Sequence, residues 1–216
     1  MANTEIEVIQ DIYDENDKIA AETNQELESK GIFCVNIMGA PGAGKTSSII
    51  SMVQHLGSKK IYVIEGDIES DIDTVKLKEL GIETIQINTN GACHLDAPTI
   101  KTSLKGLPLD QSGILFIENI GNLVCPAEFQ IGEHIKMLIC SAAEGSDKPY
   151  KYPLAFEKAD IILLTKCDLK TYVDFNDEFF TKGIKALNKT APIFEVNAKT
   201  GEGFNAVADW ISQKVG

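Results

Sequence analysis

The chain has 216 residues, of which 44% are hydrophobic and 24% charged, and this composition fits one α/β domain with a substantial core. Its formal net charge of −12 at pH 7 argues against nucleic acid or an anionic membrane as a partner, because the overall electrostatic interaction of this chain with their phosphate groups is repulsive. No apolar run approaches the roughly 20 residues of a membrane span, and the start of the chain is acidic where a signal peptide is basic, so we expect a cytoplasmic protein.

Apolar residues among the first 30 positions recur at helical spacing, with acids between them. They are Ile6, Ile9, Tyr13 and Ala20. We therefore predict a helical segment over residues 1–30, packed on a single α/β domain over 31–216. The same stripe would suit a partner surface, although an apolar stripe more often faces a core.

A glycine-rich turn over residues 39–46, GAPGAGKT, follows an apolar run over 32–38 and precedes a predicted helix over 47–56. This order is typical of a P-loop, in which backbone N–H groups surround phosphate oxygens. The lysine of the motif binds the β- and γ-phosphates, and the following hydroxyl binds the Mg²⁺ that bridges them. The predicted nucleotide-binding residues here are Gly39, Gly42, Ala43, Gly44, Lys45, Thr46 and Ser47.

Two further predicted strands end in acidic residues. The strand over 59–66 ends at Asp67, and the buried strand over 113–119 carries Glu118. Open parallel sheets bind their ligands at the carboxyl ends of the strands, so we expect Asp67 and Glu118 to hold Mg²⁺ together with Thr46, or to orient water. Helix capping by Asp67 is the alternative.

The segment after this acidic strand is a candidate switch. Gly121 is expected to offer its N–H group to the γ-phosphate, and a loop that contacts only this phosphate responds to hydrolysis. Residues 120–129 therefore form the predicted switch loop. The predicted catalytic residues are Lys45, Asp67, Glu118 and Gly121. All 20 basic residues are lysines, so no arginine finger is available in cis or from an identical subunit, and slow hydrolysis is expected.

Four more apolar runs predict strands over 83–87, 135–141, 160–164 and 193–196. Between the strands we predict a helix over 69–80, a polar loop over 88–96 and an irregular loop over 144–153, which contains two prolines. This alternation predicts an α/β fold of the P-loop NTPase kind, with a doubly wound, mostly parallel sheet flanked by helices and preceded by an N-terminal helix.

Two motifs at the ends of late strands indicate a guanine nucleotide. Residues 165–168, TKCD, resemble the Asn-Lys-x-Asp motif of Ras-like GTPases, whose aspartate accepts two hydrogen bonds from guanine, a donor pair that adenine lacks. Threonine replaces the asparagine that braces this loop. Residues 197–199, NAK, resemble the Ser-Ala-Lys element that contacts guanine O6. An ordinary turn would explain either motif alone, and an ATP-using P-loop kinase is an alternative that the aspartate opposes. The predicted base-binding residues are Lys166, Asp168, Asn197, Ala198 and Lys199.

The chain has five cysteines at irregular spacings, so no disulfide framework is expected. Cys93, His94 and Cys125 offer thiolate and imidazole ligands, which suit Zn²⁺ or Ni²⁺ rather than Mg²⁺. Neighbours along an extended chain point to opposite sides, so one ion requires a bent loop or ligands shared by two subunits. A buried thiol, a solvated imidazole and an unrelated Cys-Pro turn are the alternative. The residues expected to be structural are Cys34, Cys140 and His134.

Three segments resemble the HypB family, the nickel-incorporation GTPases of nickel-iron hydrogenase maturation, which belong to the SIMIBI class of P-loop GTPases. They are CHLDA over 93–97, ENIGNLVCPA over 118–127, and residues 144–153. The similarity extends from the P-loop to Lys199. The related urease GTPase shares the P-loop but has Cys-Pro-His, whereas Ala127 follows Pro126 here.

The resemblance implies a GTP-dependent homodimer that hydrolyses GTP to GDP and phosphate and acts as a metallochaperone for nickel-iron hydrogenase. It implies that Cys93, His94 and Cys125 form a nickel or zinc site at the dimer interface, which releases the ion on hydrolysis. The implied partners are a hydrogenase maturation protein and the hydrogenase large subunit. The alternatives are a nucleotide-gated metal-binding scaffold with negligible turnover and a urease-type nickel-insertion GTPase.

Overall fold

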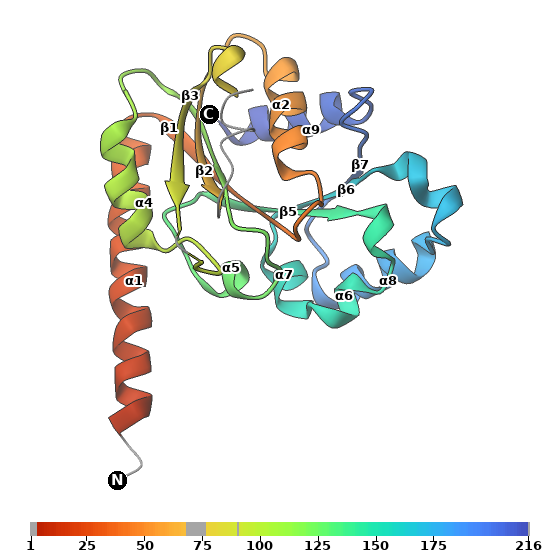
Figure 1. Cartoon of the computed structure of the whole chain (residues 1–216), viewed down its shortest axis with the longest axis horizontal. Coiled ribbons are helices and arrows are strands. Elements are labelled where there is room, and N and C mark those ends of the chain that lie inside the picture. Colours follow the sequence, from red (N-terminus) through yellow and green to blue (C-terminus); the bar gives the residue numbers. More distant parts are fainter. Residues whose placement is uncertain (1–3, 68–76, 90, 216) are drawn as a thin grey trace.

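The computed structural model describes residues 4–67, 77–89 and 91–215, with the backbone alone described for residues 4–12 and for Asp67. The described strands form one seven-stranded sheet in the order β3-β2-β4-β1-β5-β6-β7, and every pairing is parallel (Figure 1). The strands are β1 (Ile32–Gly39), β2 (Lys60–Asp67), β3 (Glu83–Asn88), β4 (Gly113–Glu118), β5 (Ile135–Ser141), β6 (Ile161–Thr165) and β7 (Ile193–Glu195). The predicted fold class is confirmed, and each predicted strand agrees with the structure to within one residue at either end.

Helices cover both faces of this sheet. The α-helices are α1 (Thr4–Ser29), α2 (Lys45–His55), α4 (Ala97–Ser103), α5 (Cys125–Glu128), α6 (Lys148–Lys151), α7 (Pro153–Lys158), α8 (Asp177–Leu187) and α9 (Phe204–Lys214), and the 3₁₀ helices are η1 (Leu104–Gly106), η2 (Ala142–Glu144) and η3 (Cys167–Tyr172). The helices α2 and α9 pack on one face, while α1 and α4 pack on the other beside α7 and α8. Because both faces are covered, the central strands are buried along their length and consist of continuous apolar runs.

The predicted irregular loop over 144–153 was wrong, because this segment contains α6 and leads directly into α7. Pro149 and Pro153 lie in the first turns of these helices, where the missing N–H group leaves no hydrogen bond unmade. The two prolines therefore lie at the starts of two helices and do not mark an irregular loop. The predicted helix over 69–80 lies mostly outside the described residues.

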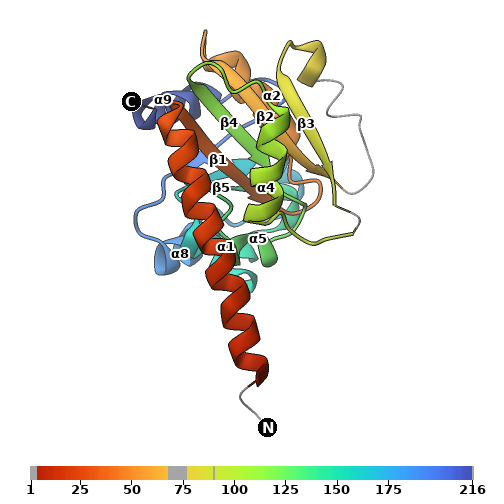
Figure 2. The same ribbon diagram turned by 90° about the vertical axis from the view of Figure 1, so that its left-hand side faces the viewer.

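The helix α1 is 26 residues long, and it lies against α4 and the sheet before extending past the body of the domain at its N-terminal end (Figure 2). Its own residues Ala20, Thr23 and Leu27 are buried. Among the described residues, no helix has both the length and the apolar character needed to cross a bilayer.

Candidate functional site

The turn between β1 and α2 forms a cradle of backbone N–H groups at the carboxyl edge of the sheet. Gly39 ends β1, and a Cβ at this position would lie 2.6 Å from the carbonyl oxygen of Ile139. Gly44 precedes α2 with a φ of 97°, a left-handed conformation that favours glycine. The N-terminus of α2 lies at the space above the turn, and the positive end of a helix suits an anion.

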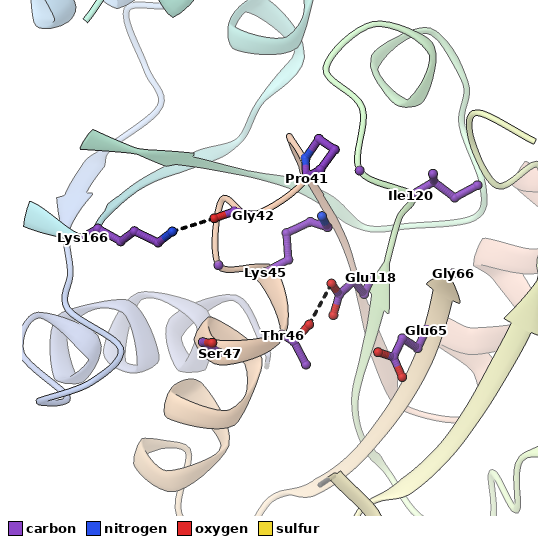
Figure 3. Close-up of a pocket in the computed structure, with 12 residues that line it drawn as sticks. Pro41, Gly42, Lys45, Thr46, Ser47, Glu65, Gly66, Glu118, Ile120 and Lys166 are labelled. Atoms are coloured by element: carbon purple, nitrogen blue, oxygen red, sulfur yellow. Dashed lines mark hydrogen bonds between the residues drawn. The ribbon is translucent and has the colours of Figure 1, made fainter. Parts of the chain in front are cut away.

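A cavity of about 450 Å³ lies above this turn (Figure 3). Its lining consists of Pro41, Gly42, Gly44, Lys45, Thr46, Ser47, Glu65, Gly66, Glu118, Ile120, Gly121 and Lys166. Lys45 donates to the carbonyl oxygen of Ala40 at 3.4 Å, and Lys166 donates to that of Gly42 at 2.8 Å. The cavity thus combines two ammonium groups with a helix N-terminus, an arrangement that attracts phosphate.

Acidic side chains form the opposite wall of the cavity. Glu65 and Glu118 are paired across β2 and β4, and both are buried. The Thr46 hydroxyl donates to Glu118 Oε1 at 3.0 Å. Hydroxyl and carboxylate oxygens are ligands that Mg²⁺ prefers, so these residues fit the ion. Asp67 ends β2, but its side chain lies outside what the structure describes. The sequence reasoning missed Glu65, although an acid within an apolar strand was a usable signal.

A second cavity of about 450 Å³ adjoins the first and shares Gly44, Ser47 and Lys166 with it. It is also lined by Thr165, Asp168, Leu169, Asn197, Ala198 and Lys199. The two sequence motifs for guanine therefore meet in one cavity beside the P-loop. Gly39 and Ala43 line neither cavity, and the Ala43 side chain is buried in the core.

Thr165 braces the P-loop, which the replacement of asparagine by threonine in this motif did not predict. Its hydroxyl oxygen lies 2.6 Å from the carbonyl oxygen of Ala43 and 3.1 Å from that of Cys140. Lys166 follows in a left-handed conformation, with a φ of 55°. The two residues that precede Asp168, the predicted base-binding aspartate, are thus tied to the P-loop by a hydroxyl and an ammonium group.

The ligand atoms of Cys93, His94 and Cys125 all lie within 4.8 Å of one another. Cys93 Sγ is 3.4 Å from His94 Nδ1, so the loop is bent, and one chain brings all three ligands together without a second subunit. Cys93 is exposed, while His94 and Cys125 are half-buried. Two sulfur atoms and one imidazole nitrogen fit Zn²⁺ or Ni²⁺. Within the described residues, no other group of this kind was found.

The protonation of these groups follows from their surroundings. Burial lowers the pKa of His94 below its ordinary 6.5, so the imidazole is in its neutral, ligating form at pH 7. The hydrogen bond with Cys125 raises the pKa of Cys93, and burial raises this pKa further. An arriving ion must therefore displace the thiol proton.

The predicted switch loop joins the two parts of the site. Asn122 pairs with Gly39 of the P-loop in an isolated antiparallel bridge, and a Cβ on Gly121 would lie 2.9 Å from Pro41. The Asn122 amide donates to the carbonyl oxygen of Cys93 at 3.2 Å and accepts from the Val124 N–H at 2.9 Å. One side chain therefore contacts both segments that carry the cysteines, at Cys93 and at Val124, which precedes Cys125. The sequence reasoning missed Asn122, because nothing in the loop sequence shows which of its residues contacts Cys93, 29 positions away.

A second amide supports the same loop from beneath. The buried Asn119 Oδ1 accepts from the N–H groups of Leu95 and Ile120 at 3.1 Å and 2.9 Å, and its Nδ2 donates to Asn36 at 3.1 Å. The residue after His94 and the start of the switch loop thus share one acceptor.

The surroundings of Cys34, Cys140 and His134 agree with the structural role expected of them. Cys34 and Cys140 are buried, and burial raises the pKa of both thiols well above the ordinary value. His134 Nδ1 accepts from the Cys34 N–H at 2.9 Å, and its ring stacks on Phe33 at 5.1 Å.

Residues 33–195 match the family described as CobW/HypB/UreG, nucleotide-binding domain. A hydrogenase maturation factor HypB from Rhizobium leguminosarum bv. viciae is 41% identical over 207 residues, which cover 95% of this chain and 69% of that protein. Hydrogenase maturation factor HypB from Archaeoglobus fulgidus has a crystal structure that superposes with a TM-score of 0.87 at 36% identity, covering 94% of this chain and 99% of that one. HypB from Helicobacter pylori in complex with nickel superposes with a TM-score of 0.89 at 32% identity, covering 93% of this chain and 95% of that one.

Proposed function

The chain belongs to the HypB family of hydrogenase maturation factors, within the CobW/HypB/UreG group, and we propose that it hydrolyses GTP to control a nickel ion destined for a hydrogenase. The observation that carries this proposal is the contact made by Asn122, which pairs with Gly39 of the P-loop and donates to Cys93 of the metal cluster. A change at the phosphates therefore has a direct route to the thiolates.

In this proposal the P-loop backbone and Lys45 bind the phosphates of GTP, and the Gly121 N–H contacts the γ-phosphate. Thr46, Glu118 and Asp67 hold Mg²⁺, which offsets phosphate charge when bound. Glu65 lies beside Glu118 and adds to the negative charge of this wall. The guanine base enters the second cavity, where it is held by Lys166, Asp168, Asn197, Ala198 and Lys199.

Hydrolysis removes the phosphate that the switch loop contacts. We expect the loop to lose its contact at Gly121, to shift Asn122 and to move Cys125 relative to Cys93. Soft-metal affinity depends on ligand geometry, so this movement changes how tightly the ion is held. The cargo would then pass to a maturation partner or to the hydrogenase large subunit, and a nucleotide-dependent homodimer is the expected working state.

Nickel affinity in two nucleotide states tests the coupling. We would titrate Ni²⁺ against a chromophoric chelator with the protein bound either to GDP or to a non-hydrolysable GTP analogue, and repeat the titration with Zn²⁺. The two Ni²⁺ affinities should differ by about 5-fold or more, the lower end of known allosteric coupling. Asn122→Ala should bring the ratio towards one, whereas Asn205→Ala on the exposed face of α9 should leave it unchanged. Equal affinities in the parent protein would reject the coupling.

Turnover and base choice need separate measurements. Phosphate release should exceed that of Lys45→Ala, and a rate equal to this background would favour the nucleotide-gated scaffold. GTP should displace ATP in competition. Asp168→Asn should lower affinity for GTP and raise affinity for xanthosine triphosphate, because an amide can donate to the carbonyl that replaces the guanine amine.

A further inference from the structure

Three aromatic rings form a continuous stack from the proposed metal site of Cys93, His94 and Cys125, called the cluster below, to the N-terminal helix. The rings of His94 and Phe129 are stacked with centroids 4.1 Å apart, and those of Phe129 and Tyr13 are stacked at 5.0 Å. Phe129 immediately follows α5, which begins with Cys125, and Tyr13 lies on α1. The Tyr13 hydroxyl also donates to Glu128 at 3.4 Å. The stack therefore connects a candidate metal ligand to a helix that extends beyond the domain.

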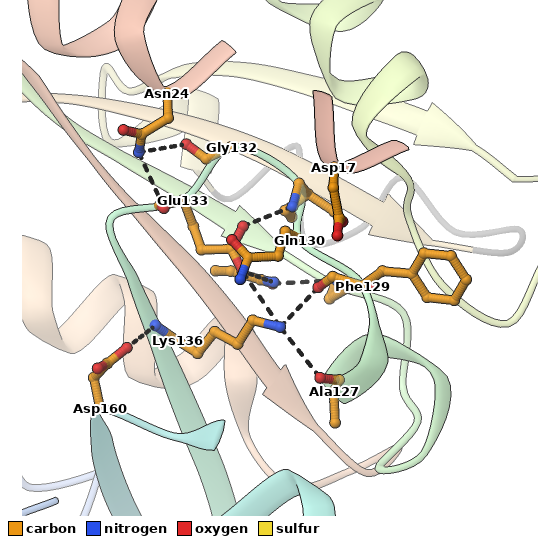
Figure 4. A network of polar contacts seen from close by, with 12 residues as sticks. Asp17, Asn24, Ala127, Phe129, Gln130, Gly132, Glu133, Lys136 and Asp160 are labelled. Atoms are coloured by element: carbon orange, nitrogen blue, oxygen red, sulfur yellow. Dashed lines mark hydrogen bonds and ion pairs between the residues drawn. The ribbon is translucent and has the colours of Figure 1, made fainter. Parts of the chain in front are cut away.

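The backbone around Phe129 is fixed independently of the stack (Figure 4). The ammonium group of Lys136 on β5 donates to the carbonyl oxygens of Phe129 and Ala127 at 2.7 Å and 3.2 Å. The buried Asn16 of α1 donates to the Gln130 carbonyl oxygen at 2.9 Å. With its backbone held, the Phe129 ring projects away from this polar network and offers a firm surface to the His94 ring.

We propose that Phe129 is a positioning residue for the metal cluster, and that it links occupancy of the cluster to the docking of α1. This inference rests on the metal site proposed above. A metal-bound imidazole carries more positive charge than a free one, so its attraction to the face of the Phe129 ring is stronger. The loaded cluster therefore favours the stacked arrangement, in which Tyr13 also packs. By linkage, a partner that binds α1 and withdraws Tyr13 lowers the affinity of the cluster for its ion.

Nickel titration of matched variants tests the positioning role. Phe129→Leu removes the stack but keeps apolar bulk, and it should weaken Ni²⁺ binding by about 2- to 12-fold, the range expected for loss of one aromatic pair. Phe129→Tyr keeps an aromatic ring at this position, so it should bind Ni²⁺ with the affinity of the parent protein. Tyr150→Leu, which removes an aromatic stack with Phe179 away from the cluster, should leave Ni²⁺ affinity unchanged.

Amide hydrogen exchange in α1 gives a readout that general destabilisation would not reproduce. In the parent protein, Ni²⁺ should slow exchange around Tyr13, and this effect should disappear in Phe129→Leu while the thermal transition of that variant stays cooperative. Equal Ni²⁺ affinity in the parent and Phe129→Leu, with the same slowing in both, would overturn the inference and leave the metal site standing. Failure of the parent to bind Ni²⁺ would instead overturn the metal site, and the inference with it.

Discussion

Replacing Lys136 by methionine should lower the free energy of unfolding by about 3–5 kcal/mol, the range seen when one partner of a buried ion pair is removed. The Lys136 side chain is 9% exposed and that of Glu133 is 4% exposed, with Nζ and Oε1 3.5 Å apart. Methionine would leave the Glu133 carboxylate buried without this cation, and it would remove the donor from the carbonyl oxygens of Ala127 and Phe129. For a domain of this size, the loss corresponds to a fall of about 6–20 °C in Tm.

Urea and thermal unfolding followed by circular dichroism would measure this loss. Lys136 and Lys158 both line a further cavity of about 430 Å³, which is separate from the two described above. Lys158→Met is the matched control, because Lys158 is exposed. Glu133→Gln removes the carboxylate charge that Lys136→Met would leave buried without its cation. The free energy of unfolding of the double variant Glu133→Gln/Lys136→Met should therefore exceed the value expected from adding the two single effects by about 1–3 kcal/mol.

Two outcomes would refute this reasoning. A loss in Lys136→Met no larger than that in Lys158→Met would mean that the ammonium group does not hold the end of α5. Additive effects in the double variant would mean that Glu133 and Lys136 do not interact across their 3.5 Å separation.

Three other predictions concern the bracing threonine, the buried thiols and the exposed Cys93. Thr165→Val keeps the shape of the side chain but removes the hydroxyl. It should lower the free energy of unfolding by about 1–3 kcal/mol and weaken GDP binding. Thr165→Ser keeps the hydroxyl, so it should retain the stability and the GDP affinity of the parent protein. Thermal unfolding and GDP titration would check this, and full GDP affinity in the valine variant would contradict it. Burial raises the pKa of Cys34 and Cys140, so only the unfolded chain releases these protons above pH 9, and stability should fall as pH rises beyond 9 by up to about 1.4 kcal/mol per unit for each thiol. Unfolding of Cys34→Ala/Cys140→Ala should show a shallower slope, and an unchanged slope would assign the loss to other groups. At pH 8, a thiol reagent should modify exposed Cys93, with protection by Ni²⁺, and should leave the two core thiols unmodified until unfolding.

The central strands could be predicted from sequence because they are buried on both faces and therefore appear as apolar runs that stop where the site begins. β5 was predicted with its observed bounds. The family resemblance was also confirmed, since it rests on short contiguous segments. The prediction for residues 144–153 was wrong because proline ends a helix from its interior but is favoured in the first turn, where Pro149 and Pro153 lie.

Contacts between distant residues could not be predicted in the same way. The Thr165 hydroxyl meets Ala43 across 122 positions of sequence, and no local pattern shows that it replaces an asparagine amide. The reasoning on Cys93 and His94 assumed an extended chain, in which neighbours point apart. The structure bends this loop, so that their sulfur and nitrogen atoms lie 3.4 Å apart.

The anchors of the switch loop determine where it can move. Its far end is held by Lys136, which is fixed on β5 and has no contact with the phosphate cavity in the described structure. Its near end is held by the bridge between Asn122 and Gly39, which lies at the P-loop itself. If loss of the γ-phosphate weakens this bridge while the contacts of Lys136 persist, the loop pivots about its far end, and Asn122 should be displaced further than Ala127. Cys125 lies between them and would move by an intermediate amount, enough to change its distance from Cys93 while Phe129 stays stacked on His94. In the proposed cycle, GTP hydrolysis would then loosen the Cys125 thiolate and leave the His94 imidazole in place, so the ion would be handed over while part of its site stays intact.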